Sequence, residues 1–209
     1  MSFKKQLNWR YATKRMNGQK VDDVKFQNIL DAIQLAPSSM GLQPFSVIVV
    51  KDLETRKKMA PVCFNQPQIL EADAILVFAA WKNITEENVN TYIDNIINTR
   101  NAPSESLEGF KQNILGLVNG KTQEELVIWS SKQAYIALGF GLFAAAIEEV
   151  DTTPMEGFNP DALDEILQLN QKGLKSLALL AVGHRDAEND YLNGAAKVRR
   201  PASDFFIHI

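Results

Sequence analysis

The stretch Ala134-Tyr-Ile-Ala-Leu-Gly-Phe-Gly-Leu-Phe-Ala-Ala-Ala-Ile147 is apolar on nearly every face that a helix would present. A helix of this kind is buried on all sides. The apolar run is shorter than the roughly 20 residues that span a bilayer, and Lys132, Glu148 and Glu149 flank it, so a core helix is expected. We predict one helix over 124–150. In a chain of 209 residues, burial on all sides predicts a second subunit.

Around this helix the sequence predicts alternating strands and helices. Continuous apolar or β-branched runs predict buried strands at 45–50, 73–81 and 177–182. Helices are expected at 2–8, from Asp22 or Asp23 up to Pro37, at 52–60 and at 160–169, with a turn at 153–157. The second of these helices has an apolar stripe formed by Phe26, Ile29, Leu30 and Ile33. Residues 85–118 are polar and helical, interrupted at Pro103 and Gly109, and predict an excursion from the main body. Strands separated by helices indicate an α+β or α/β sandwich.

Composition excludes several classes of protein. The single cysteine, Cys63, excludes a disulfide framework and is expected to be a small buried hydrophobe, and the two histidines are too isolated to predict a metal site. The net charge of -3 argues against nucleic-acid binding. The N-terminus lacks the apolar run of a secretory signal. We therefore expect a soluble cytoplasmic protein of one domain, with no metal and no membrane contact.

Two basic clusters lie at opposite ends of this acidic chain. Arg10, Lys14 and Arg15 stand near the start, and Lys197, Arg199 and Arg200 near the end. If the two ends meet, a phosphate is the simplest anion to hold them together, and the alternative is a set of solvated surface charges. Neither a dinucleotide-binding Gly-x-Gly-x-x-Gly nor a phosphate-binding Gly-x-x-x-x-Gly-Lys motif is present. A nucleotide would therefore bind through another scheme.

Five local motifs occur in a specific order. They are Arg10-Tyr-Ala-Thr-Lys14, Pro37-Ser-Ser-Met-Gly-Leu-Gln-Pro44 before a strand, Asn65, Pro154-Met-Glu-Gly157, and Lys197-Val-Arg199. From about residue 8 to the end, the chain resembles the FMN-dependent nitroreductase family, in its oxygen-insensitive NAD(P)H nitroreductase and dihydropteridine reductase branch. The resemblance implies a three-layer α-β-α sandwich with a central, mostly antiparallel sheet, in an intertwined homodimer. It also implies one domain over 1–209, with a helical excursion at 85–118 and a tail at 184–209 that wraps the partner.

The resemblance also implies roles for individual residues around FMN at the subunit interface. Arg10, Lys197 and Arg199 would clamp the phosphate, and Lys14 would lie at N1 and O2 of the flavin. Asn65 would bind the amide edge of the ring, and the backbone amides of Glu156 and Gly157 would face N5 and O4. The partner would supply Ser38, Ser39 and the backbone near Gly41. The remaining expected cofactor contacts are Tyr11, Ala12, Pro37, Gln68, Pro154 and Met155.

Departures from the family pattern bear on potential and substrate. Gln68 stands where relatives often carry a lysine, so the sequence predicts a lower flavin potential and a rise on Gln68→Lys. Gly41 stands where well-studied relatives carry asparagine, so one hydrogen bond to ring or substrate is expected to be missing. Acceptor contacts are expected from Gly41, Phe110, Ile114 and Leu115.

The expected activity is hydride transfer from NAD(P)H through FMN to nitroaromatics, quinones or related conjugated acceptors, in a ping-pong cycle. No side chain need act as acid or base, because the flavin carries the chemistry. Three alternatives stay open at this point. They are dihydropteridine, enone or dehalogenating reduction on the same scaffold, flavin binding without turnover, and an interaction protein without flavin.

Overall fold

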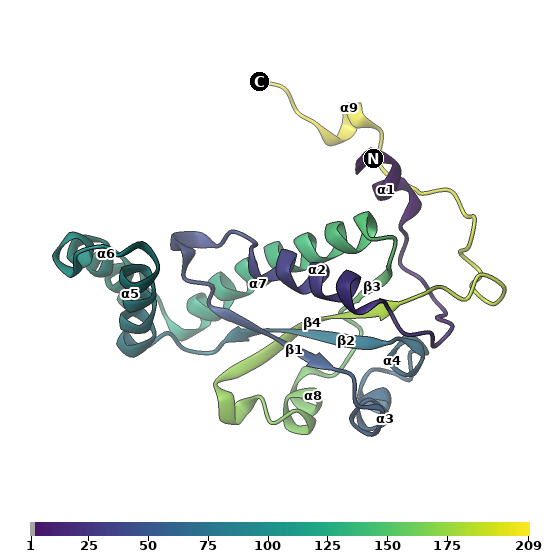
Figure 1. The fold of residues 1–209 in the computed structure, drawn as a ribbon, viewed down its shortest axis with the longest axis horizontal. Coiled ribbons are helices and arrows are strands. Elements are labelled where there is room, and N and C mark those ends of the chain that lie inside the picture. The colour runs from purple at the N-terminus through teal and green to yellow at the C-terminus, as the bar shows by residue number, and fades with distance from the viewer. Residues whose placement is uncertain (1–2) are drawn as a thin grey trace.

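A sheet with helices on both faces forms the body of the protein (Figure 1). Within residues 3–209, which the computed structural model describes, the sheet has four strands in the order β1-β2-β4-β3. The strands are β1 (Phe45–Val50), β2 (Ala74–Trp81), β3 (Asp151–Met155) and β4 (Leu174–Gly183). Each neighbouring pair is antiparallel. The predicted α+β class with an antiparallel central sheet is confirmed.

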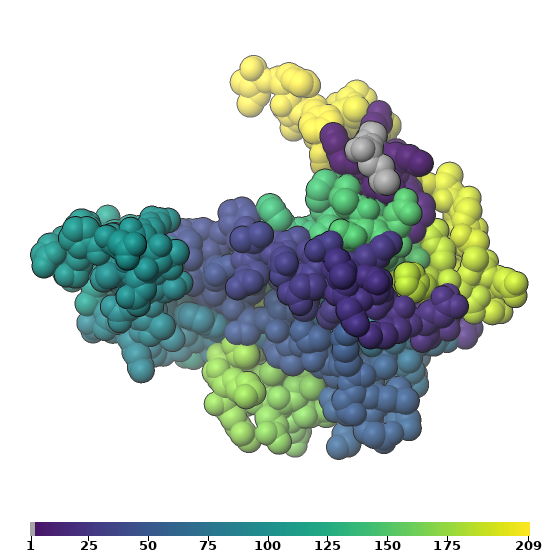
Figure 2. All heavy atoms as spheres, in the orientation of Figure 1, coloured from purple at the N-terminus to yellow at the C-terminus, as the bar shows by residue number. Residues whose placement is uncertain are grey.

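The helices form the two outer layers and an extension. They are α1 (Phe3–Trp9), α2 (Asp23–Gln34), α3 (Leu53–Val62), α4 (Gln68–Glu71), α5 (Glu86–Arg100), α6 (Glu108–Asn119), α7 (Gln123–Ile147), α8 (Pro160–Ile166) and α9 (Ala202–Phe205). Helices α2 and α7 cover one face of the sheet, and α3 and α8 cover the other (Figure 1). The α5–α6 pair projects from one end of the body (Figures 1 and 2).

Alternation along the central strand divides the core in two. In β2, Ile75 and Val77 pack on the side of α3 and α8, whereas Leu76 and Phe78 pack on the side of α2 and α7. This follows from the period of two in a strand. Nearly all of β2 and β4 is buried because both lie inside the sheet. Strand β1 is an edge strand and only Val50 in it is buried, so the predicted full burial of 45–50 is wrong.

The long helix α7 packs one side on α2 and β2. Gly141 allows this approach, since a Cβ there would lie 2.9 Å from the Ile33 side chain. On another side Ile136, Phe140 and Phe143 are each about 40% exposed. Burial on all faces is therefore not achieved within one chain. At 25 residues, α7 is long and apolar enough to cross a membrane by length and composition alone, but its packing on α2 and the sheet is that of the predicted core helix.

Several predicted boundaries are also corrected. Residues 151–155 form an edge strand paired with β4, where we expected a turn; an edge position tolerates Pro154. The long helix ends at Ile147, three residues early, and α8 ends at Ile166. Gly109 does not interrupt the excursion, because it lies in the first turn of α6. The cap predicted at Ser2 lies outside the described residues.

The C-terminal segment after β4 returns past the N-terminal helix and then projects from the body (Figures 1 and 2). Its last part exposes apolar side chains, among them Val198, Phe206 and Ile207. Cys63 is fully buried, as predicted, and burial raises the pKa of its thiol to about 11.

Candidate functional site

The basic residues from the two ends of the sequence meet in one chain. Lys197 Nζ donates a hydrogen bond to the carbonyl oxygen of Arg10 at 2.5 Å. Arg10, Lys197 and Arg199 line one cavity of about 530 Å³. The other lining residues come from 8–12, from Pro154 and Arg185, and from 192–198. The convergence that the sequence required for an anion site is therefore present.

The charges around this cavity are mutually unfavourable. Burial lowers the pKa of the Arg10 guanidinium, and Arg199 lowers it further, against a smaller opposing effect of Asp151. Burial also lowers the pKa of Lys197, with Arg10 and Arg199 adding to the effect. Arg10 Nε is buried without a hydrogen-bond partner. A bound phosphate would relieve the repulsion and accept from such donors, so these residues fit the phosphate of FMN.

A buried carboxylate joins the two ends that carry the cations. Asp190 is 4% exposed and accepts from the Lys14 amide at 2.7 Å, the Leu192 amide at 2.9 Å and the Tyr11 hydroxyl at 3.1 Å. Burial alone would raise the pKa of Asp190, but these donors together hold it below its usual value. The pKa of the Tyr11 hydroxyl is raised to about 12, mainly by burial and next by the negative charge of Asp190. Asp190 thus fixes the N-terminal segment against the C-terminal one.

An arginine stacked between aromatic rings forms another wall of the cavity. The Arg185 guanidinium lies 4.5 Å from the ring centroid of Trp9 and 4.7 Å from that of Tyr11. Its Nε donates to Asp151 Oδ1 at 2.9 Å. Because Asp151 neutralises it, Arg185 serves to hold the rings in place and adds little free positive charge.

The segment that carries Lys14 is held from behind. Thr153 Oγ1 and Gln68 Nε2 both donate to the Thr13 carbonyl, at 2.6 and 2.9 Å. Gln68 is 3% exposed and its Oε1 is buried without a partner. Its amide nitrogen is therefore engaged inside the chain, on the backbone of the residue before Lys14. The sequence placed Gln68 near the cofactor but gave no sign of this contact.

The loop after α3 is tied to the segment after β3. Gln66 Nε2 donates to the Gly157 carbonyl at 2.6 Å. From α7, the Tyr135 hydroxyl donates to Glu156 Oε1 at 2.6 Å. Burial, together with Glu156, raises the pKa of Tyr135 to about 12. Asn65 has a left-handed φ of 52° and an exposed side chain. These contacts hold Glu156 against α7 and Gly157 against the loop after α3.

The remaining predicted contacts lie elsewhere. Ser39 and Gly41 belong to the loop between α2 and β1, which lies toward α5, whereas the segment after α1 lies toward the opposite end of the sheet (Figure 1). The structure thus separates the predicted set into two groups. Residues 10–14, 65–68, 154–157 and 197–199 form one group, and residues 37–41 belong to the other.

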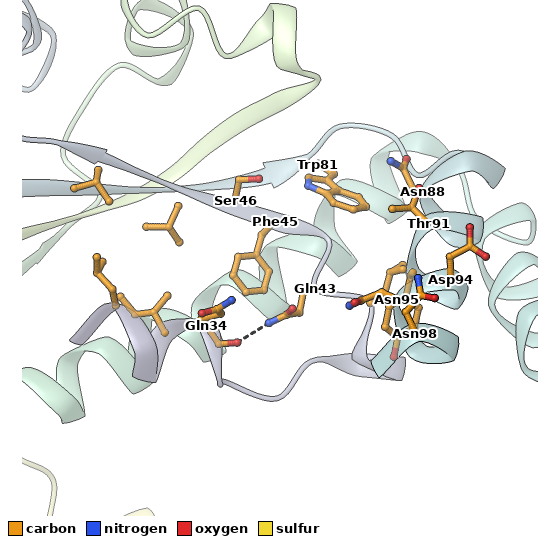
Figure 3. A pocket seen from close by; sticks show the side chains of 16 residues that line it. Gln34, Gln43, Phe45, Ser46, Trp81, Asn88, Thr91, Asp94, Asn95 and Asn98 are labelled. Atoms are coloured by element: carbon orange, nitrogen blue, oxygen red, sulfur yellow. Dashed lines mark hydrogen bonds between the residues drawn. The ribbon is translucent and has the colours of Figure 1, made fainter. Parts of the chain in front are cut away.

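A second cavity is larger than the one that Arg10, Lys197 and Arg199 line. It measures about 950 Å³ and lies between α2, β1 and α5, with Phe45, Trp81 and Asn95 among its lining residues (Figure 3). None of the predicted cofactor contacts lines it. Gln43 reaches across one side and donates to the Gln34 carbonyl at 2.7 Å.

The model of the nitroreductase family matches residues 7–184. The chain belongs to this family. It is 32% identical over 212 residues to a Staphylococcus haemolyticus protein that bears the provisional name NAD(P)H nitroreductase, covering 95% of this chain and 93% of that one. It is 28% identical over 205 residues to the major NAD(P)H-flavin oxidoreductase of Aliivibrio fischeri, covering 95% and 94%.

Solved structures show the same nitroreductase fold. A nitroreductase-type protein from Exiguobacterium sibiricum, solved with FMN, has a TM-score of 0.84 at 20% identity and covers 100% of this chain and 98% of its own. An enone reductase of gut-bacterial fatty-acid saturation has a TM-score of 0.82 at 19% identity, covering 100% and 98%. At these identities the likeness concerns the fold.

The residues expected from the sequence to contact the acceptor differ in how deeply they are buried. Ile114 is fully buried in the apolar cluster that α5 and α6 share. Phe110 and Leu115 are partly buried in the same cluster. The supporting residues Asp190, Arg185, Gln66 and Tyr135 were not found from the sequence, because nothing in their local pattern differs from that of ordinary surface or core residues.

Proposed function

We propose that this protein is a cytoplasmic, FMN-dependent oxidoreductase that takes hydride from NAD(P)H and reduces nitroaromatics, quinones or related conjugated acceptors. The observation that carries the proposal is the convergence of Arg10, Lys197 and Arg199 on one cavity. Three neighbouring cations, of which Arg10 and Lys197 are partly buried, repel one another, and this arrangement costs free energy unless an anion binds among them. The names of the relatives and the FMN in a structure of the same fold support the choice of anion.

In this proposal the phosphate lies in the cavity and the isoalloxazine extends toward Lys14. When bound, FMN supplies the redox chemistry, accepting hydride and passing it on in a ping-pong cycle. Lys14 stabilises negative charge at N1 and O2, so it favours reduction. Asn65 and the amides of Glu156 and Gly157 orient the ring. Gln66 supports this segment through the Gly157 carbonyl, and Tyr135 supports it through the Glu156 carboxylate. No side chain needs to transfer a proton at a reacting atom.

We further propose that the working site needs two chains. Ser38, Ser39 and Gly41 lie away from the cation cluster within one chain, so a partner would supply them. The exposed apolar side of α7, with Ile136, Phe140 and Phe143, is the surface on which the copies would pack. Residues 184–209 would extend over the partner, whose surface would cover the apolar side chains that this segment exposes in one chain. Phe110 and Leu115 would contact the acceptor.

The deciding experiment is the visible spectrum of the purified protein before and after anaerobic NAD(P)H. We expect flavin absorbance that NAD(P)H bleaches and an added quinone or nitroaromatic restores. FMN added to stripped protein should raise its melting temperature by mass action, and riboflavin, which lacks the phosphate, should raise it less. A colourless protein unaffected by FMN contradicts the proposal. A yellow protein that NAD(P)H does not bleach indicates flavin binding without turnover.

The choice of acceptor needs its own screen. Enone, dihydropteridine and halogenated acceptors should be tested beside quinones and nitroaromatics, each against the reduced protein. We expect quinones and nitroaromatics to reoxidise it fastest. Faster reoxidation by one of the other classes would reassign the substrate and leave the flavin site unchanged.

A further inference from the structure

The loop that would meet the flavin from the partner side has an unusual backbone. Met40, Gly41 and Gln43 have φ values of 55°, 69° and 48°. For residues with a side chain, such conformations persist where the surroundings fix them. Helix α7 stabilises part of this loop conformation, because Gln133 Oε1 accepts a hydrogen bond from the Ser39 amide at 2.7 Å.

The other support comes from the excursion. Tyr92, on α5, donates its hydroxyl hydrogen to the Met40 carbonyl at 2.8 Å. The ring of Tyr92 is partly buried in the core of the α5–α6 pair. Tyr92 also lines the cavity between α2, β1 and α5. One side chain therefore joins the loop to the projecting helices.

The glycine at 41 is matched to this contact. A Cβ at Gly41 would overlap the Tyr92 hydroxyl oxygen and lie 3.3 Å from Cζ. The positive φ of Gly41 also disfavours a side chain. The contact between loop and tyrosine thus requires a residue without a side chain at this position.

Tyr92 also contacts the residue expected to meet the acceptor. Its ring packs edge-on against Phe110 of α6, with centroids 6.4 Å apart and an interplanar angle of 64°. A continuous path runs from Met40 through the Tyr92 hydroxyl and ring to Phe110. One hydrogen bond and one ring contact therefore link the 38–43 loop to the α5–α6 pair.

We propose that Tyr92 is a positioning residue that couples the α5–α6 helices to the 38–43 loop, and that Gly41 is the residue that admits it. The inference rests on the proposed function, in which the loop contacts FMN and Phe110 contacts the acceptor. Tyr92 then sets the height of the helices above the flavin and so the size of acceptor that fits. Acceptor preference and loop order depend on the same hydroxyl.

The first test uses flavin-free protein and the variant Tyr92→Phe, which removes only the hydroxyl. Amide hydrogen exchange over residues 38–43 should become about 2- to 10-fold faster, as expected for one lost hydrogen bond. Tyr191→Phe is the matched control, since its side chain is 78% exposed, and should leave this exchange unchanged. Unchanged exchange in Tyr92→Phe would overturn the coupling.

The second test is a double-mutant cycle of Gly41→Ala and Tyr92→Phe, read as the ratio of kcat/KM for a bulky and a small quinone. We expect Tyr92→Phe to change this ratio about threefold or more, at a nearly unchanged melting temperature. Gly41→Ala should weaken FMN binding, and the added Tyr92→Phe should recover part of the loss. Independent effects, or an unchanged quinone ratio, would contradict the proposal.

Failure of the two proposals can be told apart. If wild-type protein binds no FMN, the proposed function fails, and the role of Tyr92 in acceptor choice fails with it. If wild-type protein is yellow and NAD(P)H bleaches it, while Tyr92→Phe leaves both exchange and quinone ratio unaltered, only the coupling is wrong. Should Gly41→Ala fail to fold, Tyr92→Phe alone decides both readouts.

Discussion

The cation cluster and the α7–loop region differ in how complete they are within one chain. The cluster joins residues 187 positions apart, Lys197 and Arg10, and the buried Asp190 holds their segments together. The loop at 38–43 faces away from the cluster, and beside it α7 exposes an apolar stripe. Side chains of like charge repel one another, so the fold must hold each of them in place. An apolar surface, in contrast, is stabilised by contact with any other apolar surface that removes it from water. Under the proposed function, a single chain would therefore form the phosphate site by itself, and a second copy would be needed to complete the site for the flavin ring.

The largest effect is expected from breaking the apolar stripe. Phe140→Glu, at a side chain 41% exposed, should convert a dimer into monomers, because dimer formation would bury a charge. We expect the dissociation constant to rise by about a hundredfold or more. Light scattering after size exclusion measures it, with FMN retention as a second readout. Val24→Glu, on α2 and 69% exposed, is the control. Wild-type protein that is already monomeric would contradict the two-chain site.

Removing one cation tests the cavity lined by Arg10, Lys197 and Arg199, which is formed within one chain. Arg10→Ala should weaken FMN binding by about 10- to 100-fold, the usual effect of losing hydrogen bonds to a charged group. Riboflavin binding, which lacks the phosphate, should change little. Fluorescence titration gives both constants, and Arg100→Ala, at the end of the excursion helix α5, serves as control. Equal weakening for both ligands would place Arg10 away from the phosphate.

Asp190→Asn should loosen the joint between the two ends of the chain. The hydrogen bonds to its carboxylate predict a loss of about 1–3 kcal/mol in unfolding free energy at neutral pH. The pKa of Asp190 is lower in the folded protein than in the unfolded chain. The Asp190 carboxylate therefore stabilises the fold at pH values above its unfolded-state pKa, and this stabilisation is lost as the pH falls through its folded-state pKa. The wild-type and variant stabilities should therefore converge below about pH 4. Urea unfolding of flavin-free protein measures this, with the exposed Asp94→Asn as control. A difference independent of pH would exclude the carboxylate as its source.

The smallest effect concerns pH. Burial and its two arginine neighbours lower the pKa of Lys197, and phosphate binding requires the charged ammonium. FMN affinity should therefore be full below that pKa and fall as pH rises through it, by roughly 3- to 10-fold between about pH 7 and 10. In Lys197→Arg the fall should disappear, since guanidinium stays protonated. Binding constants measured across this range test it, and identical profiles in both proteins would remove Lys197 from the clamp.

Much of the fold could be predicted because its signals are local. Strands β1 and β2 follow apolar runs, α2 begins where Asp22 caps it, and the excursion begins and ends near the predicted residues. Strand β3 was missed because Thr153-Pro154 has the composition of a turn, and only its pairing with β4 makes it extended. For the site, the charge of Arg10, Lys197 and Arg199 is visible in the sequence and their shared cavity is not, and nothing in the local pattern of α6 shows that Ile114 is buried.

Local sequence is enough to predict the order of elements, the apolar character of the α7 segment, the cations at both ends and the family motifs. All of these are set by residue type and by spacing over a few positions. Only the tertiary structure decided that Asp190 joins the ends, that Tyr92 reaches Met40, and that the loop at 38–43 lies apart from the cluster. The physical reason is distance along the chain: the Tyr11 hydroxyl finds Asp190 179 residues away, and no local period encodes such a partner.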